Sequence, residues 1–448
     1  TIGKYLSAKY LSGTVYWSLD GFGELLFTPI EGTHGNLAPF GRDATGPTGA
    51  AITTDIPWRD CVENIRSVKI ADSATAIGVS DLESAPGKNN GGSINYMFRN
   101  CVNLTTCDLT KFDTGNATSM YGMFENCISL VSVNISKFST TNVATFARMF
   151  AGSTKLETLN IANFAGPRLE SMESMFEGCT KLSTIKFPTA FNTSSTKNMK
   201  TVFKNCTSLM SLDLSGFKTE GATHMNGMFE NCTALTSVDL RSFDVASALE
   251  FSNMFKGCSK LVSANLSTFS ATSLQKTDGM FQDCRSLTTV HMPADKAFNG
   301  PTLVNIRYMF KNCTSLASID LNAMDVAGVT GGNGTYYMSE VFDGCTDITS
   351  IDISSWNLAA SQVQTYRMFY NCRNLVSVYV GSGWKKGSLN GTYSGEMFTG
   401  CVNIIGADGS TYKDGAYTYA EVGNGGYLSA KFLSNNVYWT LDHRGELL

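Results

Sequence analysis

The chain has 448 residues, enough for two or three globular domains or for one long repeat array. Its 34 basic and 38 acidic residues give a formal net charge of −4 without runs of like charge, which argues against a nucleic-acid-binding surface or a polybasic membrane patch. No stretch approaches the roughly 18 uninterrupted apolar residues of a spanning helix. No basic and apolar leader follows Thr1, so we expect a processed product or a piece of a longer protein.

The first predicted element is a β-hairpin near the start of the chain. Val15-Tyr16-Trp17 and Glu24-Leu25-Leu26 flank the turn-rich segment Leu19-Asp20-Gly21-Phe22-Gly23. Residues 5–26 recur as residues 427–448 at a constant offset of 422, with most positions identical. Both copies are therefore expected to adopt the same backbone, the second one packing on the last repeat.

A repeat fills the chain between these copies. Met-Phe recurs ten times and Val-Phe twice, and the first eight Phe residues are spaced 26 or 27 residues apart. A degenerate first unit is predicted at Pro57-Trp58-Arg59-Asp60-Cys61. After Phe281 the spacing becomes longer and less regular. The Phe residues of the twelve units are Phe98, Phe124, Phe150, Phe176, Phe203, Phe229, Phe255, Phe281, Phe310, Phe342, Phe369 and Phe398.

The first half of each unit has the spacing of a helix. In the second unit Met120, Met123, Phe124 and Cys127 lie at i, i+3, i+4 and i+7, which would form one apolar helix face. A short helix is therefore predicted around each Met-Phe.

The second half of each unit has the spacing of a strand. Leu130, Val133 and Ile135 follow the pattern L-x-x-L-x-L, whose last pair alternates, and Phe138 follows three residues later to anchor a turn. One unit cannot bury its own apolar face, whereas stacked units share a continuous core. The expected fold is an α/β repeat solenoid with a parallel β-ladder on one face and short helices on the other.

Eleven of the thirteen cysteines occupy one position, three residues after the Phe of each unit, and Ser153 takes that position in the third unit. Cys107 replaces the aliphatic residue of a strand. We expect small, buried, reduced side chains, because equivalent side chains in stacked coils point the same way and disfavour disulfide geometry. Metal binding would need ligands converging from several directions, and the chain has four histidines.

These motifs resemble the BspA-like branch of bacterial leucine-rich-repeat surface proteins. The resemblance is carried by Met228-Phe229-Glu230-Asn231-Cys232-Thr233-Ala234-Leu235 and Asp213-Leu214-Ser215, which recur along residues 58 to about 405. Trp17, Leu19, Gly23 and Leu25 match a segment that precedes each repeat array in that family. The resemblance implies an extracellular, cell-attached protein that adheres to a host, a matrix or other cells, and it implies no catalytic residues.

Four segments are predicted. Residues 1–57 form an N-terminal β-hairpin or cap, and residues 58–405 form the solenoid of twelve units plus the degenerate one. Residues 406–426 are a Gly- and Tyr-rich connector. Residues 427–448 begin the next module, so the parent protein is expected to carry tandem modules of about 422 residues.

Catalytic chemistry is not expected. No nucleotide-binding, zinc-protease or nucleophile-elbow motif occurs, and a cysteine repeated at one buried position is unlike an activated nucleophile. The chain is predicted to be no enzyme and to need no cofactor. The repeated Asn-Cys-Thr at Asn205, Asn231 and Asn312 is interpreted as a turn rather than a glycosylation site.

A row of polar residues, ten positions after each Phe, is the first candidate binding face. One interpretation is a concave surface that binds a glycan or Ca²⁺. The other, which we favour, is a solvated sheet face whose Asx side chains support local turns. Other units have Lys186, His291 and Tyr379 at this position. The Asx members are Asp108, Asn134, Asn160, Asp213, Asp239, Asn265, Asp320 and Asp352.

Insertions in the late units are the second candidate, because extra residues in repeat proteins map to loops that often bind partners. Tyr336, Tyr337 and Tyr393 are the candidate contacts there, whereas Trp384 is expected to be buried near the core Phe position.

Two functions compete on this sequence. The first is an extracellular adhesion module that binds a protein or glycan on host or neighbouring cells. The second is a structural spacer or fibre subunit, whose partners are neighbouring modules of the same protein end to end. Both place the chain at the cell surface, without nucleic acid and without a membrane span in this segment.

Overall fold

The structure is a computed structural model that describes residues 10–12, 14–31, 35–37, 56–72, 77–79, 93–293, 303–321, 324, 326, 329, 337–356, 363–381, 384, 396–405, 428–430, 432–434 and 437–439. The chain divides into two compact units, Thr1–Ala222 and Thr223–Leu448. Each is described by itself. We number the twelve repeats as coils 1 to 12 after their Phe residues, so that Phe98 belongs to coil 1 and Phe398 to coil 12.

The first unit holds a hairpin cap and the strands of the first coils. Its elements are β1 (Tyr10–Ser12), β2 (Val15–Leu19), β3 (Glu24–Pro29), β4 (Gly35–Leu37), the 3₁₀ helix η2 (Arg59–Asn64), β5 (Ser67–Ile70), β6 (Ile77–Val79), β7 (Thr106–Asp108), β8 (Ser132–Asn134), β9 (Thr158–Asn160) and β10 (Thr184–Lys186). One sheet has the order β1-β2-β3-β5-β7-β8, and β10 pairs with β9 and β4 with β6. The cap strands β1 to β3 are antiparallel, whereas β3 joins the parallel ladder through β5.

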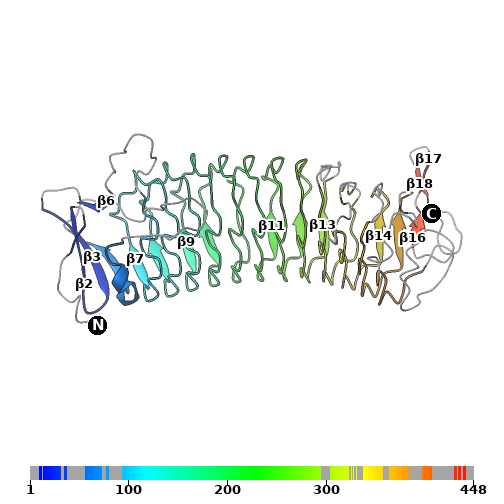
Figure 1. The fold of residues 1–448 in the computed structure, drawn as a ribbon, viewed down its shortest axis with the longest axis horizontal. Helices are drawn as coiled ribbons and strands as arrows, with labels where there is room; N and C mark the ends of the chain where they lie inside the picture. Colours follow the sequence, from blue (N-terminus) through cyan, green and yellow to red (C-terminus); the bar gives the residue numbers. More distant parts are fainter. Residues whose placement is uncertain are drawn as a thin grey trace. The chain divides into compact units, whose positions relative to one another are not determined.

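The second unit continues the same pattern within itself. Its strands are β11 (Ser237–Asp239), β12 (Ser263–Asn265), β13 (Thr289–His291), β14 (Ser350–Ile353), β15 (Ser377–Val380), β16 (Leu428–Ala430), β17 (Phe432–Ser434) and β18 (Val437–Trp439). The sheets have the orders β11-β12-β13, β14-β15-β16 and β17-β18. Strands β11 to β13 lie side by side along one face of the stacked coils (Figure 1).

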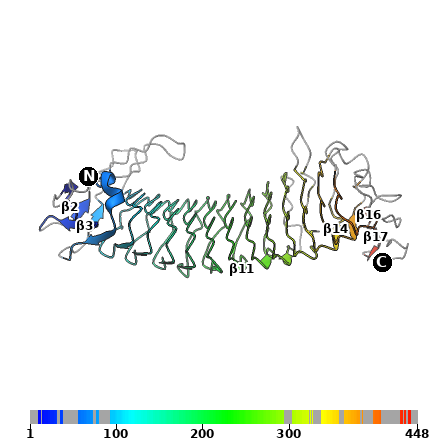
Figure 2. The same ribbon diagram turned by 90° about the horizontal axis from the view of Figure 1, so that it is seen from below.

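The strands pair in parallel and in phase with the repeat. Ser237 lies opposite Ser263, and Ser263 lies opposite Thr289, so equivalent positions of successive coils are neighbours. A second parallel line runs five residues before the Phe, as in the bridge from Ser119 to Thr145. Figure 2 shows the resulting stack of coils within each unit. The predicted parallel solenoid is therefore confirmed.

The predicted helices around Met-Phe are wrong, because these segments are chains of turns. The residues two positions before and two positions after each coil's Phe all have positive φ, from 50° to 83°. A right-handed helix needs negative φ throughout, so two such residues within five positions exclude it. The only helix in the described part of the chain is η2. The expected α/β class is thus corrected to a solenoid of strands and turns.

The backbone hydrogen bonds explain this outcome. In coil 2 the N–H groups of Gly122, Phe124 and Asn126 donate to carbonyls of the next coil at 2.7 to 2.9 Å. The residues between them donate to carbonyls three positions earlier. Alternate N–H groups thus hold successive coils together, whereas a helix would have used all of them internally.

Stacked Phe rings form the core. In the second unit, successive Met-Phe and Val-Phe rings lie 5.3 to 5.6 Å apart with interplanar angles of 5° to 12°. In the unit Thr1–Ala222, Trp58 stacks on Phe98 with ring centres 6.3 Å apart and begins an equivalent row. This is expected, because Trp58 belongs to the degenerate repeat that precedes coil 1. The Phe residues that follow the strands and anchor the turns are also buried, as at Phe138 and Phe243.

The predicted hairpin is formed by β2 and β3, and the counterpart of β3 in the second copy lies outside the described residues. The neighbouring pair β1–β2 recurs as β17–β18 in the same register. Tyr10 lies opposite Trp17 in β1 and β2, and Phe432 lies opposite Trp439 in β17 and β18, at the offset of 422 seen in the sequence. In the second copy β16 also extends the parallel ladder by pairing with β15, the strand of coil 11. The second copy thus extends the ladder at coil 11, whereas the prediction placed it on the last repeat, near Cys401 of coil 12.

Candidate functional site: the strand face and the turn edge

The cysteines form a row of hydrogen-bond donors rather than a reactive site. In coil 4 the thiol of Cys179 donates to the carbonyl of Phe150 in the preceding coil, with Sγ and O 3.1 Å apart. Ser153 makes the same bond to Phe124 at 2.9 Å, which explains why serine can stand here. All thirteen cysteines are free and buried, as predicted. Burial raises the pKa of Cys179 to about 12, the opposite of an activated thiol.

The strand face consists of two rows, the residues eight and ten positions after each Phe. Position eight is a hydroxyl row in which, for example, Thr158 lies opposite Thr184. Position ten is the predicted Asx row. Asp108, Asn134, Asn160, Asp213, Asp239 and Asp320 are exposed, and Asn265 and Asp352 are half-buried.

The Asx side chains are used by the turns that follow the strands. Oδ1 of Asp108 accepts a hydrogen bond from the N–H of Thr110 at 3.0 Å, and Oδ1 of Asp352 accepts bonds from the N–H and hydroxyl of Ser354. The same bond to residue i+2 is made by Asn134, Asn160, Asp213, Asp239 and Asn265. This geometry favours the turn interpretation, and a glycan or Ca²⁺ ligand on this face stays a prediction.

The charge of Asp239 is balanced within its own coil. Nη2 of Arg241 lies 2.7 Å from Oδ2 of Asp239, and these hydrogen bonds lower the pKa of Asp239 to about 2. Lys186 and His291 are exposed members of the same row, and Tyr379 is half-buried. Within the described ranges, no group of three or more His, Cys, Asp or Glu residues could hold a metal ion.

The predicted loop contacts are only partly described. Tyr336 and Tyr393 lie outside the described residues, and Tyr337 is half-buried. Trp384 is 3% exposed, which confirms the expected burial. No helix in the described part of the chain is long and apolar enough to span a membrane.

A second surface, the turn edge, was missed by the sequence interpretation. It comprises, in each coil, the residues from three positions before the Phe to two after it. In coils 9 and 11 these include Tyr308, Tyr366 and Tyr370, all half-buried. The guanidinium of Arg307 lies 4.2 Å from the ring centre of Tyr308, and that of Arg367 lies 4.7 Å from Tyr370.

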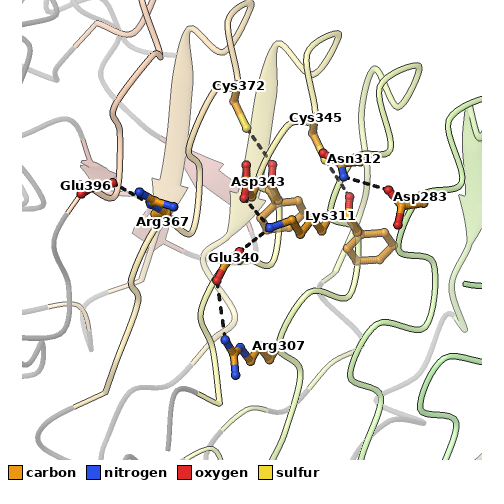
Figure 3. A network of polar contacts seen from close by, with 12 residues as sticks. Asp283, Arg307, Lys311, Asn312, Glu340, Asp343, Cys345, Arg367, Cys372 and Glu396 are labelled. Atoms are coloured by element: carbon orange, nitrogen blue, oxygen red, sulfur yellow. Dashed lines mark hydrogen bonds and ion pairs between the residues drawn. The ribbon is translucent and has the colours of Figure 1, made fainter.

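Ion pairs link the turn edges of neighbouring coils. Lys311 of coil 9 contacts Glu340 and, at 2.9 Å, Asp343 of coil 10 (Figure 3). Arg367 of coil 11 lies 2.6 Å from Glu396 of coil 12. Burial raises the pKa of Asp343, and this effect outweighs the opposite influence of Lys311.

The sequence contained a usable indication of this surface. Arg307-Tyr308 and Tyr366-Arg367 directly precede Met-Phe in the late coils. The predicted helix hid this indication, because a helix cannot contain the positive φ found two residues before the Phe and would direct these side chains elsewhere. The expected turns at Asn205, Asn231 and Asn312, in contrast, are confirmed by φ values of 59° to 61°.

Stacked coils that each carry a short strand with the L-x-x-L-x-L pattern define the leucine-rich-repeat class. Residues 252–405 match the BspA type leucine rich repeat region (6 copies), and residues 92–186 and 183–293 match the family described as Mycoplasma protein of unknown function, DUF285. The chain is a BspA-like leucine-rich-repeat protein.

Solved structures with some similarity are also leucine-rich-repeat proteins. A leucine rich cell surface protein from Faecalibacterium prausnitzii A2-165 is 16% identical over 86% of this chain and 98% of its own, with a TM-score of 0.36. A leucine-rich repeat protein from Eubacterium ventriosum ATCC 27560 is 14% identical over 86% and 95%, with a TM-score of 0.37. No curated protein sequence matches the chain.

Proposed function

We propose that the chain is a non-catalytic extracellular repeat module of a bacterial cell-surface protein, and that it mediates adhesion through the turn edge of coils 9 to 11. The observation that carries this proposal is the cluster of Tyr308, Tyr366 and Tyr370 with Arg307 and Arg367. Tyrosine and arginine dominate the energetics of protein interfaces. The BspA-like family supports the location at the surface.

The test uses beads coated with the purified chain and counts their binding to cultured epithelial cells and to mucin-coated and fibronectin-coated surfaces. The double variant Tyr366→Ala and Tyr370→Ala should lose most binding to whichever surface the parent binds. A matched control, Thr158→Ala with Thr184→Ala on the strand face, should retain it. Loss in the control alone would move the binding site to the strand face, and no binding by the parent to any surface would reject adhesion.

A structural spacer is the second candidate, and the duplicated hairpin favours it. The first strand of the C-terminal copy extends the ladder of coil 11, and the third strand of the N-terminal copy, β3, starts a ladder with β5. The same sequence segment thus supplies a strand suited to the end of one array and another suited to the start of the next. Tandem modules of about 422 residues would then abut with a fixed rise and twist.

Small-angle scattering of a two-module protein tests this second candidate. A rigid junction gives a maximum dimension close to twice that of one module and a scattering curve fitted by one conformation. A curve that requires an ensemble of flexibly linked modules would reject the spacer and leave independent adhesion modules.

A further inference from the structure

The charges of the turn edge alternate in sign from coil to coil. Within the six residues from three before the Phe to two after it, no coil mixes the two signs. The odd coils are positive, through Arg99, Arg148, Lys200, Lys204, Lys256, Arg307, Lys311 and Arg367. The even coils are negative, through Glu125, Glu173, Glu177, Glu230, Asp278, Asp283, Glu340, Asp343 and Glu396. The backbone repeats every coil, whereas this pattern repeats every second coil.

Coil 2 of the first unit shows what the alternation does. The side chain of Glu125 is 3% exposed, and its carboxylate lies 2.9 Å from Arg99 of coil 1 and 2.7 Å from Arg148 of coil 3. Arg148 in turn lies 3.9 Å from Glu177 of coil 4. A buried carboxylate therefore has a cation on each side along the stack.

Coil 10 of the second unit has carboxylates beside two cations of coil 9, on one side of the stack (Figure 3). Glu340 lies 3.7 Å from Arg307 of coil 9, and it also contacts Lys311. Because the groups are partly withdrawn from water, replacing either cation by a carboxylate would place like charges together with little screening.

The contacts that recur in nearly every coil do not distinguish one neighbour from another. Every coil presents the same Phe ring, and nearly every coil the same Cys donor and alternating N–H groups, so coil 2 could stack on coil 4 as well as on coil 3 by these contacts alone. A repeat array needs some variable feature to disfavour such slipped pairings.

We propose that the alternating charges set the stacking register, so that a pair of coils, and not a single coil, is the structural unit of the array. Coils of opposite parity attract each other, and coils of the same parity repel. Skipping one coil during folding, or exchanging coils with a second copy of the chain, is thereby disfavoured.

Two deletions with matched junctions test the proposal within the first unit. Deleting residues 128–153 removes one coil and brings Glu125 next to Glu173 and Glu177. Deleting residues 128–179 removes two coils and brings Glu125 next to Lys200 and Lys204. Both deletions join Cys127 to a Thr-Lys-Leu sequence, so the repeat pattern is kept.

The measurement is the urea midpoint of unfolding for the intact chain and the two deletions. If every coil contributed alike, the midpoint would fall steadily with the number of coils removed. The proposal predicts instead that the two-coil deletion is more stable than the one-coil deletion. Added NaCl should raise the midpoint of the one-coil deletion and lower that of the two-coil deletion. A steady fall with equal salt effects would overturn it.

A third comparison uses Glu125→Gln in all three backgrounds. The substitution should lower the midpoint of the intact chain and of the two-coil deletion, because it removes attractive pairs. In the one-coil deletion that loss should vanish or reverse, because repulsion with coil 4 is removed too. The same loss in every background would contradict the proposal.

If a deletion does not fold, the intact chain provides an independent test. Arg148→Met removes the cation, and Arg148→Glu places a carboxylate between Glu125 and Glu177. The Glu variant should have the lower midpoint of the two, and NaCl should raise that midpoint. Equal midpoints for the two variants would overturn the proposal.

Discussion

Replacing Phe255 by alanine should remove a substantial share of the stability of the second unit. The ring is fully buried and lies 5.3 Å from each of Phe229 and Phe281, with interplanar angles of 5° and 6°. Truncating a buried phenylalanine costs about 3–5 kcal/mol. Each stacked pair adds roughly 0.5–1.5 kcal/mol to burial. Because two pairs are lost, we expect a loss at the upper end of the range, about 5 kcal/mol.

Urea denaturation followed by circular dichroism measures the loss, and hydrogen exchange locates it. The N–H of Phe255 donates to Met280 of coil 8, and the N–H of Phe229 donates to Met254 of coil 7. Both amides should exchange faster in the variant, because the stability of a stacked array is largely coupling between neighbours.

Phe22→Ala is the matched control. Its ring is 88% exposed, so the same truncation should change the free energy of unfolding by less than about 0.5 kcal/mol. A loss below about 1 kcal/mol for Phe255→Ala would refute the view that the Phe stack is the core. Faster exchange confined to coil 7 would refute the coupling between coils.

Three further predictions concern the buried Cys row and the turns. Burial raises the pKa of Cys179 to about 12, so the thiol of the unfolded chain ionises at a lower pH than the thiol of the folded chain. The free energy of unfolding should therefore fall as the pH rises from about 9 to 12. Urea midpoints measure this, and unchanged midpoints across that range would contradict it. Ser153→Ala removes one of the two donors to the buried carbonyl of Phe124, which keeps the N–H of Cys127, and should cost about 0.5–1.5 kcal/mol. Ser153→Cys should be nearly neutral by thermal melting. Gly257→Ala should lower the free energy of unfolding by about 1–3 kcal/mol, because φ is +74° and the added Cβ would lie 2.2 Å from Oδ1 of Asn231. Gly115→Ala is the control, because φ is not positive at Gly115.

Much of the fold could be predicted from single residues and their spacing. The period of 26 or 27 residues required stacking, because one coil has too little apolar surface to fold alone. The recurrence of one cysteine predicted a buried row, and even the exception at Cys107 takes the strand position that its spacing indicates. The repeat of residues 5–26 predicted a shared backbone, and β1–β2 does recur as β17–β18 in the same register.

The candidate site was less predictable. Position ten after each Phe was correctly placed on the strand face, but its Asx oxygens serve the following turns, as at Asp108 and Asp352. The turn edge with Tyr308 and Arg367 was not recognised, since its residues become neighbours only when coils stack 26 to 32 positions apart in the chain.

The sequence alone determined the repeat, the strands and the buried rows, because apolar spacing and recurrence directly reflect which side chains must leave water. It could not decide between a helix and a chain of turns. The spacing i, i+3, i+4 and i+7 of Met120, Met123, Phe124 and Cys127 suits both, since bonds to carbonyls three residues back also bring such positions onto one side. The choice depended on the neighbouring coil, which takes the alternate N–H groups that a helix would have kept, and on the positive φ at Gly122 and Asn126 that this sharing requires.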